Sequence, residues 1–256
     1  MQIGFAPTES AELRAEMHHH LASLPGAMDE FLEEHVRSSK HRVISVGGSR
    51  AGFASIHQGS LITQFSLEPA FQCFGQAAFH ALRKLECVRT AFVPTYDEFY
   101  LSHAIDDYRQ LTKQAYFFEA LTKTHATGQA QEYRLHPANA AAEHLIRDRT
   151  GDLFGNLAER LQRGELFSTD RAGECVGFGV LSRSEYQPGV ASIGMFTIER
   201  FRGLGVGTAT ISLLIEECTR RGLRAVAGCW YYNHASKRTL ERAGMITKTR
   251  LLRLDY

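Results

Sequence analysis

The 256-residue chain has 44% apolar and 22% charged residues, a composition typical of a soluble globular protein. No apolar run approaches the roughly 20 residues that a membrane helix needs, and the acidic N-terminal segment does not resemble a signal peptide, so we expect a cytoplasmic protein without membrane contact. The formal net charge of +1 is dispersed along the chain, which argues against nucleic-acid binding.

The first half of the chain predicts strands and helices from its apolar periodicity. Strands are expected near Ile3–Phe5, Arg42–Val46, Gly52–His57, Leu61–Leu67 and Val88–Val93, with a strand pair near Leu111–Glu119. Helices are expected near Ala11–Leu24, Met28–Ser38, Gly75–Leu85 and Glu98–Asp106.

The second half predicts a similar order of elements. Strands are expected near Glu132–His136, Cys175–Ser182, Ala191–Ile198, Ala225–Trp230 and Ile246–Leu254. Helices are expected near Ala140–Arg147, Leu153–Arg163, Gly207–Arg221 and Ser236–Ala243. This alternation favours an α/β fold with a mixed sheet, of the α+β kind.

Three short matches connect the two halves. They pair Gly52-Phe53 with Gly177-Phe178, Phe71-Gln72-x-x-Gly75 with Phe201-Arg202-x-x-Gly205, and Thr112-Lys113 with Thr247-Lys248. Because the matches are collinear, they indicate an internal duplication, a tandem repeat of one domain. We therefore predict a domain at residues 1–121, a polar linker at 122–131 and a second domain at 132–256.

Cysteines and histidines do not predict a metal site. The five cysteines are widely spaced without a C-x-x-C pair, and we interpret them as buried or idle thiols. The triplet His18-His19-His20 lies on the predicted helix Ala11–Leu24, with His18 and His19 on its solvent side. We expect no bound metal.

The most informative segment is the glycine-rich turn from Arg202 to Gly207, between a strand and a helix. Glycines at alternate positions leave backbone amides uncovered, and the helix adds unpaired N–H groups and the positive end of its dipole. Residues 126–256 hold 18 Lys and Arg against 14 Asp and Glu, a balance that suits a small polyanion. The spacing G-x-G-x-G matches neither a Rossmann fingerprint nor a Walker loop.

Arg202-x-x-Gly205-x-Gly207 resembles the Q/R-x-x-G-x-G/A signature of the GNAT N-acetyltransferase superfamily, whose turn binds the CoA pyrophosphate. Downstream, Asn233-x-x-Ser236 with Gly244-Met245 resembles the second signature of that family. The resemblance implies acetyl-CoA as cosubstrate. It implies cofactor contacts from Phe196, Thr197, Ile198, Arg202, Gly203, Leu204, Gly205, Val206, Gly207, Thr208, Asn233 and Ser236.

The sequence offers several candidates for the groups that move protons. Many family members have a tyrosine where this chain has Leu240, and the form of the second signature instead resembles relatives in which a serine at the Ser236 position is the acid. Ser236 is also a suitable helix N-cap, and both roles stay open. A base must take the proton of the attacking amine, and the candidates are His234, Tyr231, Tyr232 and Glu185.

The N-terminal copy keeps Gln72-x-x-Gly75-x-Ala77 but has Asp97 roughly where the second copy has Asn233. An acidic group beside the cofactor arm disfavours a polyanion, so we expect a degenerate GNAT-like domain before a complete, catalytic one. The prediction is an N-acetyltransferase that binds one acetyl-CoA in its C-terminal copy. The acceptor is expected to be an amine of a small molecule or a peptide N-terminus, and a homodimer is left open. The alternative is a non-catalytic acyl-CoA-binding or regulatory module.

Overall fold

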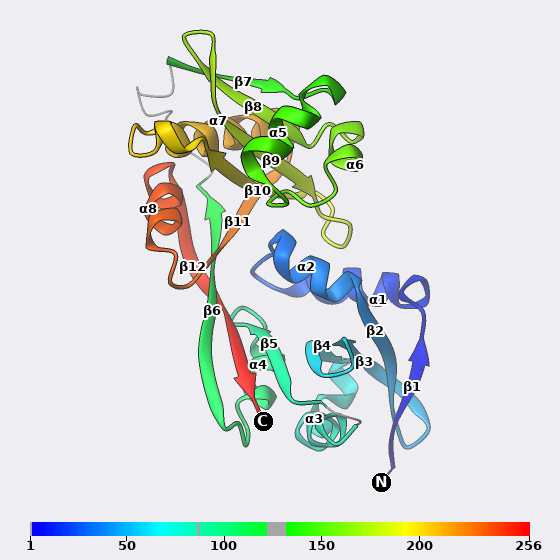
Figure 1. The fold of residues 1–256 in the computed structure, drawn as a ribbon. Coiled ribbons are helices and arrows are strands. Elements are labelled where there is room, and N and C mark those ends of the chain that lie inside the picture. Colours follow the sequence, from blue (N-terminus) through cyan, green and yellow to red (C-terminus); the bar gives the residue numbers. More distant parts are fainter. Residues whose placement is uncertain (1, 86–87, 122–131) are drawn as a thin grey trace. The chain divides into compact units, whose positions relative to one another are not determined.

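The computed structural model describes residues 2–85, 88–121 and 132–256 (Figure 1). These residues form two compact units. Unit 1 comprises Met1–Phe117, Trp230–Tyr232 and Thr249–Tyr256, and unit 2 comprises Phe118–Cys229 and Asn233–Lys248. The predicted linker at 122–131 lies outside the described residues.

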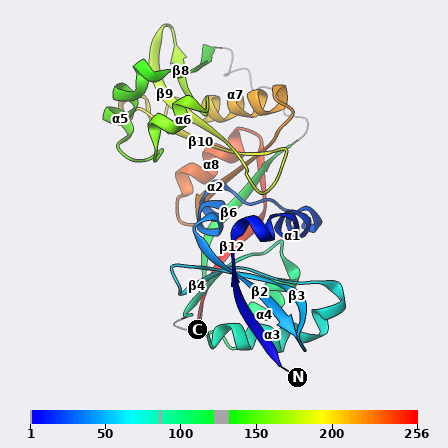
Figure 2. The same ribbon diagram turned by 90° about the vertical axis from the view of Figure 1, so that its right-hand side faces the viewer.

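Unit 1 is a sheet with helices on both of its faces. Its strands are β1 (Ile3–Thr8), β2 (Ser39–Val46), β3 (Ser49–His57), β4 (Leu61–Leu67), β5 (Thr90–Pro94) and most of β6 (Gln110–Ala120). Figure 2 shows α1 (Ser10–Ser23) and α2 (Glu30–Arg37) on one face of β1–β4, and α3 (Gly75–Arg83) and α4 (Glu98–Ala104) on the other. The 3₁₀ helix η1 (Pro69–Phe74) leads into α3.

Unit 2 repeats this order of elements. Its strands are β7 (Tyr133–Pro137), β8 (Leu166–Arg171), β9 (Glu174–Arg183), β10 (Val190–Thr197) and most of β11 (Arg224–Trp230). Its helices are α5 (Glu143–Thr150), α6 (Leu157–Gln162), α7 (Val206–Arg220) and α8 (His234–Arg242), with 3₁₀ helices η3 (Ala140–Ala142) and η4 (Glu199–Phe201). β8 was not predicted, because only the first two of its six residues are apolar.

One parallel strand pair diverges in each unit. In unit 1 the strands run antiparallel from β1 to β4, and β4 then pairs parallel with β5 at two positions, ending at Ile62↔Ala91. In unit 2, β10 and β11 pair in parallel at three positions, ending at Ser192↔Val226. Since β4 and β10 each continue for five residues beyond these points, each unit has a place where two strands separate.

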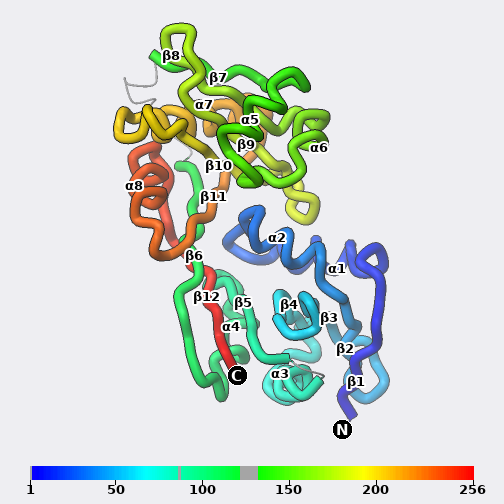
Figure 3. The backbone as a smooth tube through the Cα atoms, in the orientation of Figure 1, coloured from blue at the N-terminus to red at the C-terminus, as the bar shows by residue number. Residues whose placement is uncertain are grey.

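The last strand of the chain, β12 (Met245–Asp255), completes the sheet of unit 1. Its C-terminal part pairs antiparallel with β5, from Leu251↔Pro94 to Asp255↔Thr90. β12 also lies beside β6, as Figure 3 shows. The predicted strand pair near Leu111–Glu119 is wrong, because this segment is the single strand β6.

Both copies are complete, which corrects the prediction of a degenerate N-terminal domain. The short sequence matches fall at equivalent places in the two sheets. Gly52 of β3 lies so close to β4 that an added Cβ would overlap the carbonyl oxygen of Ser66. In the same way, a Cβ at Gly177 of β9 would overlap the carbonyl oxygen of Phe196 in β10. The same backbone approach therefore explains the same glycine in both copies.

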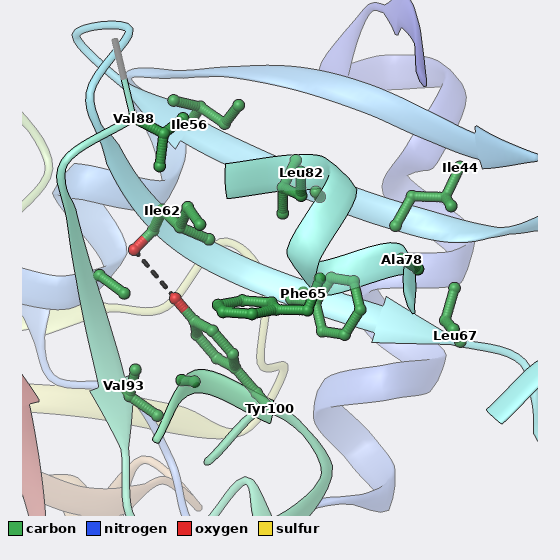
Figure 4. Packing of buried hydrophobic residues seen from close by; sticks show 14 of the residues in the cluster. Ile44, Ile56, Ile62, Phe65, Leu67, Ala78, Leu82, Val88, Val93 and Tyr100 are labelled. Atoms are coloured by element: carbon green, nitrogen blue, oxygen red, sulfur yellow. Dashed lines mark hydrogen bonds between the residues drawn. The ribbon is translucent and has the colours of Figure 1, made fainter. Parts of the chain in front are cut away.

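The core beneath α3 and α4 is built of large apolar side chains. Phe65 of β4, Phe79 of α3 and Tyr100 of α4 are fully buried, and the Phe65 and Phe79 ring centroids are 5.1 Å apart. The Tyr100 hydroxyl donates to the Ile62 carbonyl at 3.0 Å (Figure 4). Tyr100 thus reaches the point where β4 and β5 separate.

Asp29 caps α2 from a buried position, and its Oδ1 accepts the Leu32 amide at 2.9 Å. Burial raises the pKa of Asp29 to about 7. The folded state therefore holds this proton more tightly than the unfolded chain, and this contribution to stability is lost as the pH rises from about 4 to about 7. We expect Asp29→Asn to gain stability relative to the wild type over that range, measured by urea unfolding at several pH values. If the free energies of unfolding of Asp29→Asn and the wild type differed by the same amount at every pH, the raised pKa of Asp29 would be contradicted.

Candidate active site

The turn before α7 exposes backbone amides. Gly203 and Gly205 have φ of 81° and 85°, in the left-handed region that favours glycine, and Gly205 is the N-cap of α7. No side chain caps this helix end. Because the first amides of a helix have no intrahelical acceptor, the turn presents N–H donors to a ligand. The Tyr133 hydroxyl donates to the Leu204 carbonyl at 3.0 Å, which fixes the turn.

The end of β10 is half-exposed where it separates from β11. Gly194, Met195, Phe196 and Thr197 are all half-buried, in contrast to the buried first residues of the strand. Ile198 is buried and its amide donates to the Val176 carbonyl at 3.1 Å, so this amide is not free for a ligand. The predicted contacts from Phe196 and Thr197 stay predictions.

Gly207 is the point where α7, β10 and α8 come together. A Cβ at Gly207 would lie 3.1 Å from Thr239 Cγ2 and 3.3 Å from Met195 Sδ. The amides of the α7 turn, which include those of Val206 and Thr208, therefore adjoin both the end of β10 and α8. The structure thus brings together the two motifs found in the sequence. Arg202 is 61% exposed, with its guanidinium 3.7 Å from Glu199.

Asn233, not Ser236, is the N-cap of α8. The Asn233 Oδ1 accepts the Ser236 amide at 3.0 Å, which leaves the Asn233 side-chain NH₂ as a donor. Ser236 is half-buried, and its hydroxyl forms no hydrogen bond with the residues that the structure describes. The N-cap reading of Ser236 is therefore wrong, and its hydroxyl stays available for proton transfer.

The base candidates occupy different surroundings. His234 and Glu185 are exposed. Tyr231 belongs to unit 1, where its ring stacks on Tyr116 with centroids 4.6 Å apart and the Lys113 ammonium lies 4.7 Å from its ring centroid. Hydrogen bonds from Tyr116 and Lys113 lower the pKa of Tyr231. The sequence could not indicate this cluster, because Tyr231 is more than 100 residues away from Lys113 and Tyr116.

The N-terminal copy lacks an open turn at the equivalent place. Gly75, the counterpart of Gly205, has an ordinary helical φ of −54°, and its amide already donates to the Gln72 carbonyl. The ring of His103 lies against Gly75, where even a Cβ would overlap it. Continuous 3₁₀ and α-helix thus replace the glycine turn of unit 2.

The place where β4 and β5 separate is also filled. Asp97 caps α4 by accepting the Tyr100 amide at 2.9 Å, as Asn233 caps α8. Tyr100 is therefore the counterpart of Ser236, yet it is 1% exposed and bonds to Ile62. The stretch of β4 from Ile62 to Phe65 is buried throughout.

The predicted histidine helix differs in part from the structure. His19 is exposed as expected, but His18 is half-buried with a buried Nε2 that has no hydrogen-bond partner among the described residues. Within the described ranges no group of three or more His, Cys, Asp or Glu could hold a metal ion. No described helix is long and apolar enough to cross a membrane.

Comparisons with known proteins match both halves of the chain to acetyltransferase models. An acetyltransferase (GNAT) domain model matches residues 9–121, and an acetyltransferase (GNAT) family model matches residues 130–245. The comparison with curated proteins gives no match.

Solved structures share the fold along the whole chain. A GNAT-family acetyltransferase from Colwellia psychrerythraea has a TM-score of 0.87 at 19% identity, with 100% of both chains covered. A GCN5-related N-acetyltransferase from Sphaerobacter thermophilus has a TM-score of 0.62 at 13% identity, covering 99% of this chain and 95% of that one. A tandem GNAT protein from the clavulanic acid biosynthesis pathway has a TM-score of 0.60 at 12% identity, covering 100% and 98%.

Proposed function

Because the chain belongs to the GNAT acetyltransferases, with two GNAT domains in tandem, we propose that it transfers the acetyl group of acetyl-CoA directly to an amine. The acceptor is an amine of a small molecule or a peptide N-terminus. One acetyl-CoA binds per chain, in the C-terminal copy.

The contrast between the two copies carries this assignment. The turn at Gly205 is left-handed and uncapped, and the adjoining end of β10 is half-exposed. At the equivalent places of unit 1, the Gly75 amide is already bonded and Tyr100 occupies the separation of β4 and β5. As far as the described residues are concerned, a cofactor with a pyrophosphate and a long arm is therefore better accommodated by the C-terminal copy.

The proposed reaction is a direct transfer. Acetyl-CoA supplies the thioester, with its pyrophosphate on the amides of the α7 turn and its arm along the end of β10 beside Asn233. The acceptor amine attacks the thioester carbonyl, and backbone N–H groups of β10 stabilise the oxyanion. His234, which belongs to unit 2 and is exposed, takes the amine proton. Ser236 returns a proton to the CoA sulfur.

The test of this proposal is the release of CoA thiol from acetyl-CoA in the presence of a broad panel of primary amines. Transfer to at least one amine, with an acetylated product seen by mass spectrometry, supports it. Tight acetyl-CoA binding without transfer across the panel would instead support the non-catalytic acyl-CoA-binding module.

Ser236→Ala tests the assignment of the acid. Loss of a positioned proton donor costs about 100-fold in rate. We expect kcat to fall by about this factor, while the acetyl-CoA dissociation constant changes less than about threefold, since Asn233 still caps α8. Steady-state kinetics and calorimetry measure the two quantities. An unchanged kcat would exclude Ser236 as the acid.

A further inference from the structure

Among its described residues, unit 1 contains three serine–histidine pairs that the acetyl-transfer proposal does not use. Ser66 Oγ lies 3.2 Å from His20 Nδ1, Ser55 Oγ lies 2.8 Å from His41 Nδ1, and Ser38 Oγ lies 3.1 Å from His57 Nδ1. A histidine activates a serine only if it accepts the hydroxyl proton. The acceptor of the hydroxyl proton therefore decides which of the three pairs could be reactive.

In two of the pairs the hydroxyl proton is directed elsewhere. Ser55 Oγ donates to Gln64 Oε1 at 2.9 Å, and Ser38 Oγ donates to the Glu34 carbonyl at 2.6 Å. Since a hydroxyl has one proton, the histidine must be the donor in both cases. These two pairs are structural.

In the third pair, the serine hydroxyl donates and the histidine accepts. His20 Nε2 lies 3.1 Å from Asp97 Oδ2, while Asp97 Oδ1 accepts the Tyr100 amide. A carboxylate accepts hydrogen bonds, so a neutral His20 carries its proton on Nε2 and presents the Nδ1 lone pair to Ser66. The result is a Ser66–His20–Asp97 relay in which the carboxylate orients the imidazole and the imidazole accepts the serine proton.

The placement of the relay also suits chemistry. Ser66 lies near the carboxyl end of β4, past the stretch from Ile62 to Phe65 that is buried throughout, and Asp97 follows the carboxyl end of β5. The Asp97 side chain is 5% exposed, while His20 and Ser66 are both half-buried, so the relay is shielded at its carboxylate and partly accessible at its histidine and serine.

This constellation is particular to the N-terminal copy. Ser66 pairs with Phe53 in unit 1, and Phe196 pairs with Phe178 in unit 2, so Phe196 is the counterpart of Ser66. Asn233, the N-cap of α8, is the counterpart of Asp97, the N-cap of α4. Neither a nucleophile nor a carboxylate is present at those two positions. The relay therefore does not belong to the acetyl-CoA site.

We propose that Ser66, His20 and Asp97 form a nucleophilic centre in unit 1 that accepts an acyl group from an activated ester or thioester. The Ser66 Oγ–carbon bond forms as the ester or thioester bond breaks, and the serine proton passes through His20 to the leaving alkoxide or thiolate. Water, deprotonated by His20, then releases the carboxylic acid and restores Ser66. This activity is separate from acetyl transfer in unit 2.

A fluorophosphonate probe followed by peptide mapping tests the proposal on the full chain. The expected result is one phosphonate on Ser66, absent from Ser66→Ala. His20→Gln is expected to slow labelling at least about 100-fold, because the base is lost. Asp97→Asn, which keeps a good N-cap for α4, is expected to slow labelling while the protein stays folded.

Ser55→Ala and Ser38→Ala are the matched controls and should label at the wild-type rate. Urea unfolding of each variant reports folding independently of the acetyl-CoA site. Absence of label on Ser66 in the folded wild type, or labelling of Ser66 at an unchanged rate in His20→Gln, would overturn the proposal without touching the acetyl-transfer assignment.

Discussion

Replacing Gly205 with valine is expected to weaken acetyl-CoA binding at least about 100-fold. Gly205 has φ of 85°, a conformation in which a β-branched residue is strained by about 1–2 kcal/mol. Relief of that strain would rotate the amides of the α7 turn away from the ligand. The added side chain would also cover the approach to these amides. Calorimetric titration of the folded variant measures the loss.

Gly222 provides the matched control, because it lies just beyond the other end of α7. It also has a positive φ, of 69°, and a Cβ there would meet nothing within 4 Å. Gly222→Val should therefore carry a similar backbone strain and lower the melting temperature, yet leave acetyl-CoA affinity unchanged. If Gly205→Val bound acetyl-CoA as tightly as Gly222→Val, the turn would not be the pyrophosphate site.

Truncating Tyr100 to alanine is expected to destabilise the protein by about 4 kcal/mol, the usual size for removing a fully buried aromatic side chain. The Tyr100 side chain packs among Phe65 and Phe79, and its hydroxyl bonds to Ile62. Ser236→Ala, at the counterpart position of unit 2, should change stability by less than about 1 kcal/mol.

Urea unfolding of the two variants measures this difference. The expected difference would show that the position of Tyr100 stabilises the core in the N-terminal copy, whereas its counterpart Ser236 is free for chemistry in the C-terminal copy. Equal losses of stability would contradict the view that the strand separation of unit 1 is filled and that of unit 2 is open.

Local patterns predicted much of this protein. The glycine spacing from Arg202 to Gly207 predicted the strand, turn and helix that the structure contains, because positive φ angles demand glycine. The repeated Gly-Phe at positions 52 and 177 predicted the duplication, since both glycines meet a neighbouring strand. Asn233 and Asp97 were correctly matched, because each caps the helix after a parallel strand.

Features that depend on tertiary packing could not be predicted. The pairing of β12 with β5 joins segments about 160 residues apart and leaves no local signal. The completeness of the N-terminal copy was missed because its altered loop suggested decay of the fold. The copy instead differs locally, since the Gly75 amide is bonded within the loop and Tyr100 of α4 is buried. The partners of His20 were likewise hidden, because Ser66 and Asp97 lie on distant segments.

The measurement that tests the central claim most directly is the stoichiometry of acetyl-CoA binding, with one charge reversed in each copy. Calorimetry is expected to give one site per chain, weakened at least about tenfold by Arg202→Glu through charge repulsion and unaffected by Gln72→Glu. Two equivalent sites, or one site that survives Arg202→Glu but is lost in Gln72→Glu, would contradict the assignment of the cofactor to the C-terminal copy.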